Sequence, residues 1–143
     1  MTTRVCKNNM DRDSAIKLIQ SYNLPLTINI KKGADRSVEQ NKLLFLWLNE
    51  AAEQLQDETV EQKRGYCKLH FAVPLLRAED EEFREVYDEV IRPLSYEQKL
   101  KTMMIPIDLP VSRRMKSGQM KRYLDDIYDH FTGLGVKLTD PEE

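Results

Sequence analysis

The stretch Val38-Glu-Gln-Asn-Lys-Leu-Leu-Phe-Leu-Trp-Leu-Asn-Glu-Ala-Ala-Glu-Gln-Leu-Gln56 carries the strongest structural signal in the sequence. Its apolar residues recur at helical spacing, which predicts one long helix over 38–56. Four of them share a face: Leu44, Leu48, Ala51 and Leu55. Ser37 and Gln40 fit a capping box at the helix start. Further apolar residues at 43 and 45–47 widen the apolar surface, so we expect a core helix buried on two sides or one that also meets another subunit.

The residues before this helix predict a strand–helix–strand opening. Residues 3–6 are expected to form a short strand, and residues 11–22 carry apolar side chains at helical spacing. Pro25 ends that helix, because proline pushes the preceding residue out of helical geometry. Residues 26–30 then alternate between apolar and polar, which is typical of a half-buried strand. The two strands together predict a small N-terminal sheet.

The residues after the long helix are mostly helical in pattern. We expect helices over 59–76 (interrupted near Gly65 and Pro74), 80–91, 96–103 and 116–132, with Gly133 as a left-handed C-cap. Pro106 and Pro110 favour an extended segment over 104–110, and the tail from residue 139 is expected to fray. The predicted fold class is therefore α+β: a mostly helical single domain over residues 1–143, with a small N-terminal sheet, a long central helix and a C-terminal helix.

Composition indicates a globular protein of one domain. The chain has 143 residues, of which 41% are hydrophobic and 32% charged. No apolar run approaches the roughly 20 residues that cross a bilayer, and the N-terminus lacks the apolar core of a secretion signal. Cys6 and Cys67 lie far apart in sequence, which favours two reduced thiols. We therefore expect a cytoplasmic protein that does not bind membranes.

The sequence offers little catalytic or metal-binding chemistry. Cys67 and His70 are the one close pair of soft metal ligands, and a single pair is more typical of packed side chains than of a metal site. There is no nucleophile-elbow motif and no phosphate-binding glycine loop. We expect no metal, no cofactor and no catalysis. The alternative is a metal-dependent nuclease, since Glu61-Gln-Lys63 and Glu97-Gln-Lys99 match part of one nuclease signature, although chance alone predicts such matches.

Charge is distributed very unevenly along the chain, although the net charge is only −2. Between Asp108 and Asp125 there are five basic residues and no acidic one, whereas residues 79–89 are strongly acidic. Most charge runs are solvated faces, but a basic region is also what binding of nucleic-acid phosphates requires. Two segments qualify: Lys31, Lys32, Arg36 and Lys42 in the first, and Ser112, Arg113, Arg114, Lys116, Lys121 and Arg122 in the second.

Single-stranded nucleic acid also needs aromatic faces on which bases stack. The tyrosines at 66, 96, 123 and 128 are candidates, whereas Trp47 and Phe45 are expected in the core. Tyr123 directly follows Lys121 and Arg122, which makes it the best placed of the four.

Three sequence blocks resemble the phage NinB (also called Orf) family of recombination proteins. Residues 36–42, Arg-Ser-Val-Glu-Gln-Asn-Lys, continuing to Leu55, are similar to the family's R-S-x-[DE]-Q-N helix opening. Val111-Ser-Arg-Arg-Met115 resembles its S-x-R-M segment, and Gly135-Val-Lys-Leu-Thr-Asp140 resembles its ending. The order and spacing of the blocks match, and together they cover about half of the chain. Residues 77–103 do not resemble the family.

The resemblance implies a homodimeric phage or prophage protein that binds DNA, with a preference for single strands, through a basic channel. It implies an accessory role, in which the protein helps to load a strand-exchange protein and contacts a host recombinase or single-strand-binding protein. It also points to Arg36, already a candidate by its charge, and adds Gln40 and Asn41 to the candidate DNA-binding residues, although Gln40 also fits a helix cap. Two further alternatives remain open: a protein that distorts duplex DNA and flips bases, and a protein-interaction factor that does not bind DNA.

Overall fold

The structure is a computed structural model, and it describes residues 4–30 and 38–141. The chain divides into two compact units, Met1–Ala34 and Asp35–Glu143, which are considered separately below. The single-domain organisation expected from the sequence stays a prediction.

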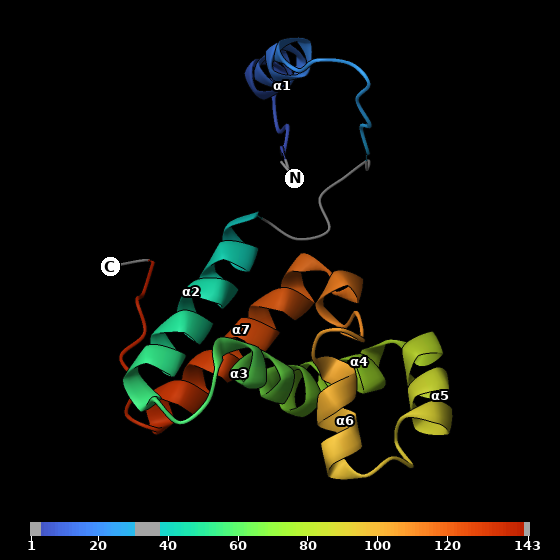
Figure 1. Cartoon of the computed structure of the whole chain (residues 1–143), viewed down its shortest axis with the longest axis vertical. Helices are drawn as coiled ribbons and strands as arrows, with labels where there is room; N and C mark the ends of the chain where they lie inside the picture. The colour runs from blue at the N-terminus through green and yellow to red at the C-terminus, as the bar shows by residue number, and fades with distance from the viewer. Residues whose placement is uncertain (1–3, 31–37, 142–143) are drawn as a thin grey trace. The chain divides into compact units, whose positions relative to one another are not determined.

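The first unit contains one helix, α1 (Asn9–Ser21), coloured dark blue in Figure 1. Asn8 caps its start, because the side-chain oxygen of Asn8 accepts a hydrogen bond from the backbone N–H of Asp11 at 2.8 Å. The helix predicted over 11–22 is confirmed to within two residues. None of the residues of α1 is buried in this structure.

The N-terminal sheet predicted from the sequence is wrong for the residues that the structure describes. Residues 4–6 and 26–30 are irregular and exposed, and residue 3 lies outside the described residues. Alternation of apolar and polar side chains fits a strand, but a strand forms only where a neighbour takes up its backbone hydrogen bonds. Neither segment has such a neighbour among the residues that the structure describes. The described residues are therefore all-α, and the α+β class is corrected to all-α.

The second unit is built from helices throughout its described part. The long helix predicted over 38–56 is confirmed as α2, and the helices predicted over 80–91, 96–103 and 116–132 are confirmed as α5, α6 and α7. In chain order the elements are α2 (Val38–Leu55), α3 (Val60–Cys67), the π-helix η1 (Lys68–Ala72), α4 (Val73–Glu79), α5 (Glu81–Val90), α6 (Tyr96–Met103), the 3₁₀ turn η2 (Ser112–Arg114) and α7 (Ser117–Gly133).

The interruption predicted near Gly65 and Pro74 does not occur. The backbone stays helical from α3 through η1 into α4, and Pro74 lies in the first turn of α4. Gly65 is buried inside α3, where a Cβ would lie 2.6 Å from Cγ of Met104. The glycine therefore allows close packing of the segment after α6 and does not break the helix.

Three expectations about the C-terminal half also need correction. Gly133 is the last residue of α7 and is not its left-handed C-cap. Gly135 takes the left-handed conformation instead, with φ of 89°. Residues 104–110 form a turn followed by an irregular segment, where an extended segment is expected from the sequence. Thr139 is not frayed: its backbone oxygen accepts a hydrogen bond from the indole N–H of Trp47 at 2.7 Å, so the tail returns along α2.

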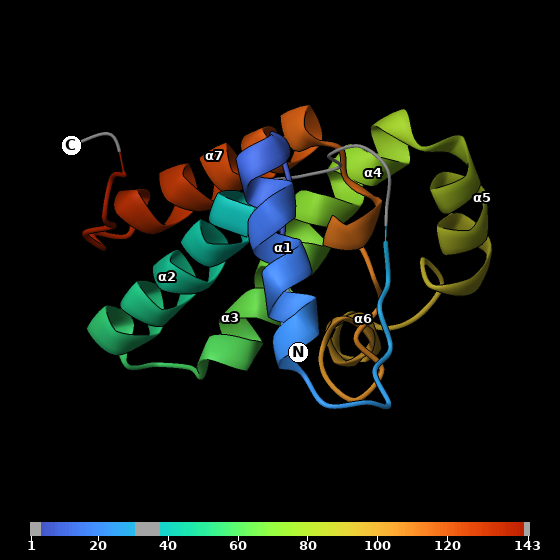
Figure 2. The same cartoon turned by 90° about the horizontal axis from the view of Figure 1, so that it is seen from above.

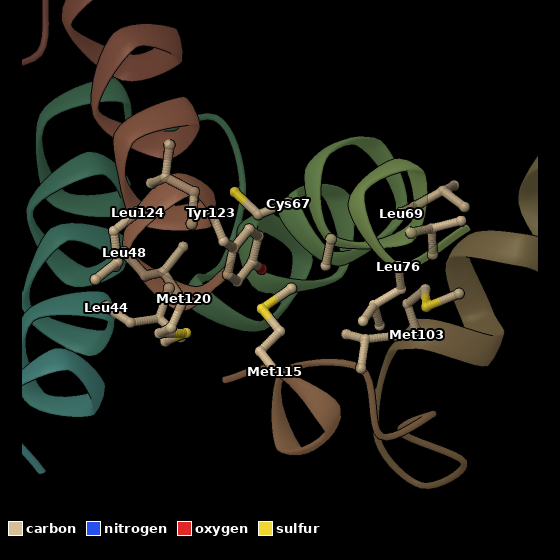
Figure 3. Packing of buried hydrophobic residues seen from close by; sticks show 14 of the residues in the cluster. Leu44, Leu48, Cys67, Leu69, Leu76, Met103, Met115, Met120, Tyr123 and Leu124 are labelled. Atoms are coloured by element: carbon tan, nitrogen blue, oxygen red, sulfur yellow. The ribbon is translucent and has the colours of Figure 1, made fainter. Parts of the chain in front are cut away.

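The core lies where α2, α7 and the α3–η1–α4 run pack together. Met120, Leu124, Ile127 and Phe131 form a buried stripe on α7 at helical spacing. Figure 3 shows Met115 and Cys67 beside the ring of Tyr123, with Leu44 and Leu48 of α2 facing α7. The side chains that are 0% exposed are Leu48, Ala51, Cys67, Ala72, Leu76, Met103, Met120 and Ile127.

No helix in the part of the chain that the structure describes has the length and apolar character needed to cross a membrane.

Candidate nucleic-acid interface

The structure brings together two basic segments that lie far apart in the sequence. Helices α2 and α7 lie side by side and run in the same direction (Figures 1 and 2), so both begin at the same end of the unit. At that end the side-chain amide of Gln40 donates a hydrogen bond to the backbone oxygen of Ser117 at 3.2 Å. At the other end, the side-chain amide of Gln54 donates to the backbone oxygen of Lys137 at 2.8 Å. Candidate residues from 40–42 and 112–122 therefore lie at the same end of the unit.

Four cations at this end face solvent and make no ion pair with any residue in the described ranges: Lys42, Arg113, Lys116 and Lys121. We call this set the basic end. Along α7 the charges run from lysines in the first turns to Asp125, Asp126 and Asp129 further on. This order opposes the helix dipole, whose positive pole lies at the N-terminus, and so weakens the helix slightly. It also concentrates positive potential at the start of α7, which favours an anionic ligand there.

The backbone at the start of α7 adds hydrogen-bond donors to this charge. The first N–H groups of a helix have no partner within the helix and bind anions well. Lys116, the N-cap residue, makes no side-chain capping bond, and its own N–H is satisfied by the Gln119 side chain at 2.9 Å. Ser117 and Gly118 are exposed. Their amides suit a phosphate group held by the neighbouring lysines.

Two other predicted site residues are already paired within the unit. Two nitrogens of the Arg114 guanidinium, Nε and Nη2, donate hydrogen bonds to the carboxylate of Asp80 at 2.8 and 3.1 Å. Arg122 donates to the carboxylate of Glu79 at 2.6 Å. These hydrogen bonds lower the pKa of both carboxyl groups and raise the pKa of both guanidinium groups. The acidic segment that the sequence analysis noted therefore lies directly against the basic one.

The stacking role predicted for Tyr123 does not fit its position. Its side chain is 1% exposed and packs in the core, where burial raises its pKa well above the usual value. Its spacing from Met120 and Ile127 places it on the apolar stripe of α7, a signal that the sequence already contained. Ser112 and Asn41 are half-buried. The predicted site residues Lys31, Lys32 and Arg36 lie outside the described residues.

Phe45 is a residue that the sequence analysis misplaced. It was expected in the core, but it is 49% exposed on α2, three residues after Lys42. Residues three apart are neighbours on a helix surface, so an aromatic ring lies next to a cation of the basic end. The sequence did contain a signal that Phe45 is exposed, namely the width of the apolar face of α2. A helix with so many apolar residues leaves some of them in solvent.

The two histidines of the chain meet around one tyrosine, which the sequence did not predict. His70 stacks on Tyr66 with ring centroids 4.1 Å apart, and His130 approaches the same ring at 5.2 Å. His70 is also hydrogen-bonded to the hydroxyl of Tyr96 at 2.8 Å. Burial lowers the pKa of both imidazoles, and the positive charge of Lys63 lowers that of His130 further.

These pKa shifts predict that the folded protein loses stability below about pH 6.5, the usual histidine pKa. In that range the unfolded chain binds protons that the folded histidines resist, so acid favours unfolding. Urea unfolding at about pH 7.5 and 5.5 measures the effect. The double variant His70→Gln/His130→Gln should show a weaker pH dependence over this range. An equal loss of stability in wild type and variant would contradict the prediction.

The structure assembles no metal site from its described residues: no three potential ligands among His, Cys, Asp and Glu come together there. Burial raises the pKa of the Cys67 thiol to about 12, so it stays protonated. Of the nuclease-like residues, Glu61 pairs with Arg64 at 3.0 Å and accepts a hydrogen bond from the N–H of Ile105, and Lys63 pairs with Asp57 at 2.7 Å. These two residues of the motif thus take part in separate structural contacts.

Comparisons with protein-family models, curated proteins and solved structures give no match to this chain.

Proposed function

We propose that this chain binds nucleic acid through the basic end, with a preference for single strands, and performs no catalysis. The observation that supports this most is that Lys42 lies at the same end of the unit as Arg113, Lys116 and Lys121, where a hydrogen bond from Gln40 to Ser117 joins the starts of α2 and α7. Cations from two segments, exposed helix amides and the positive poles of two helices all favour phosphate groups. Glu39 is exposed, and it is the one acidic residue among the described residues in the first turn of α2.

Phe45 supports the preference for single strands. A ring exposed beside a cation offers an unpaired base a surface for stacking while the cation holds its phosphate. Bases within a duplex are stacked on each other and do not present their faces in this way. We therefore propose that unpaired bases stack on Phe45 and not on Tyr123.

The biological setting that we propose follows the resemblance to the NinB family. It is that of a cytoplasmic, homodimeric accessory protein that assists the loading of a strand-exchange protein during phage recombination. The strand–helix–strand opening does not occur in the described residues, so the resemblance rests on the three sequence blocks. Two of these blocks, residues 36–55 and 111–115, contain α2 and η2, which carry Lys42 and Arg113 of the basic end.

The first experiment measures fluorescence-anisotropy binding of a labelled single strand and the matching duplex at about 50 and 200 mM salt. With four phosphate contacts, single-strand affinity should fall about 50-fold over this range. No binding by the wild type at the lower salt concentration would contradict the proposal and favour a protein-interaction factor.

Phe45→Ala should reduce single-strand affinity about five-fold or more, since base–aromatic stacking contributes about 1–3 kcal/mol. Duplex affinity should change much less. Phe45→Trp, which keeps an aromatic face, is the matched control and should retain the preference for single strands. Equal losses for single strand and duplex in Phe45→Ala would show that the ring does not contact bases.

A further inference from the structure

Two carboxylates hold the two arginines that border the basic end. Glu79 is the last residue of α4, and Asp80 follows it as the N-cap of α5. Asp80 accepts two hydrogen bonds from Arg114 in the forked arrangement that a guanidinium also makes with a phosphate. Glu82 adds a longer contact of 4.0 Å to the same guanidinium. Arg122, on the second turn of α7, is held in the same way by Glu79.

The arginines and the exposed cations belong to the same short elements. Arg113 and Arg114 are neighbours in η2, and Lys121 and Arg122 are neighbours in α7. In each pair the first member makes no ion pair with the described residues and the second binds a carboxylate. All four cations therefore lie on the same two short elements, and the carboxylates of Asp80 and Glu79 already occupy the binding positions of Arg114 and Arg122.

We propose that Glu79 and Asp80 act as an internal competitor for nucleic-acid phosphates, which must displace them to engage Arg122 and Arg114. This inference rests on the proposed function and adds a regulation of the same site. Both ion pairs are partly exposed, with the arginine side chains 53% and 39% accessible. Exposed pairs of this kind are weak and easily exchanged, so a phosphate backbone can replace the carboxylates. The pairs therefore reduce affinity and select ligands that offer several adjacent phosphates.

The variants Glu79→Gln and Asp80→Asn test this competition directly. Each removes one competing charge and keeps the shape of the side chain. In the wild-type protein the backbone N–H of Phe83 donates a hydrogen bond to the side-chain oxygen of Asp80 at 3.1 Å. Asparagine also caps helices well, so we expect Asp80→Asn to retain this bond. Glu81→Gln is the matched control, because Glu81 is exposed, adjacent in sequence and makes no ion pair with the described residues.

Single-strand binding is measured by anisotropy at about 50 mM salt for wild type and the three variants, with a thermal melt of each to confirm folding. We expect Glu79→Gln and Asp80→Asn to bind the single strand about two- to five-fold more tightly than wild type. This range follows from the free energy that an exposed ion pair contributes. Glu81→Gln, which removes the same charge nearby, should gain less than either.

If wild type binds and the two variants gain no more than Glu81→Gln, the internal competition is wrong while the proposed function stands. If neither wild type nor any variant binds, the proposed function itself is wrong. If Glu79→Gln and Asp80→Asn gain affinity beyond the control, both are supported.

Discussion

Tyr123→Ala is expected to lower the free energy of unfolding by about 3–5 kcal/mol, the usual cost of removing a large buried aromatic side chain. The ring lies 1% exposed between α7, α3 and the segment around Met115 (Figure 3). Its removal leaves a cavity among Cys67, Met115 and Met120, all of which are themselves at most 1% exposed. Urea unfolding followed by circular dichroism gives the change directly.

Tyr123→Phe is the matched control for this prediction. The phenolic oxygen makes no hydrogen bond with the residues that the structure describes, so its removal leaves no partner unsatisfied. We expect a change within about 1 kcal/mol and unchanged nucleic-acid binding. If the Tyr123→Phe protein is stable but binds nucleic acid much more weakly, Tyr123 contacts the ligand and is not only a core residue.

Lys116→Glu/Lys121→Glu is expected to weaken single-strand binding by about 50-fold or more at about 50 mM salt. The change removes two phosphate contacts and places two negative charges at the start of α7. The salt dependence should also become shallower, because each lost contact lowers the slope of log affinity against log salt by about 0.7 for single strands. The stability of α7 should not fall, since acidic residues near a helix start interact favourably with the dipole.

The control for the charge reversal is Lys101→Glu/Lys137→Glu. Lys101 lies on α6 and Lys137 in the tail beside Gln54, and both side chains are exposed. The net charge changes by the same amount, but the basic end is untouched. Equal losses in both double variants would mean that binding follows overall charge, which contradicts an interface at the starts of α2 and α7.

The helices were predictable because the signals that form them are local. The apolar spacing of α2 and the stripe from Met120 to Phe131 on α7 depend on residues three and four apart. The same locality explains why α1, α5 and α6 begin and end within two residues of their predicted bounds. The basic segments, too, were visible as runs of charge, and with them most of the candidate site.

The predictions that failed required a partner distant in sequence. An alternating segment such as 26–30 becomes a strand only beside another strand, and this structure supplies none in its described part. Gly65 looked like a helix break because the sequence does not show that Met104 packs against it. Tyr123 looked exposed because its basic neighbours in the chain outweighed its place on the apolar stripe.

The helices, their approximate ends and the charges that they carry follow from local sequence, since the interactions responsible act within one or two helical turns. Which of those charges are available to a ligand depends on how the helices pack. The parallel packing of α2 and α7 brings Gln40 to Ser117, which places Lys42 at the same end of the unit as Lys116 and Lys121, and the turn between α4 and α5 brings Asp80 to Arg114. These contacts span 77 and 34 residues, and whether they form depends on how the helices pack, because the strength of an ion pair or a hydrogen bond falls with distance in space and is unrelated to distance along the chain.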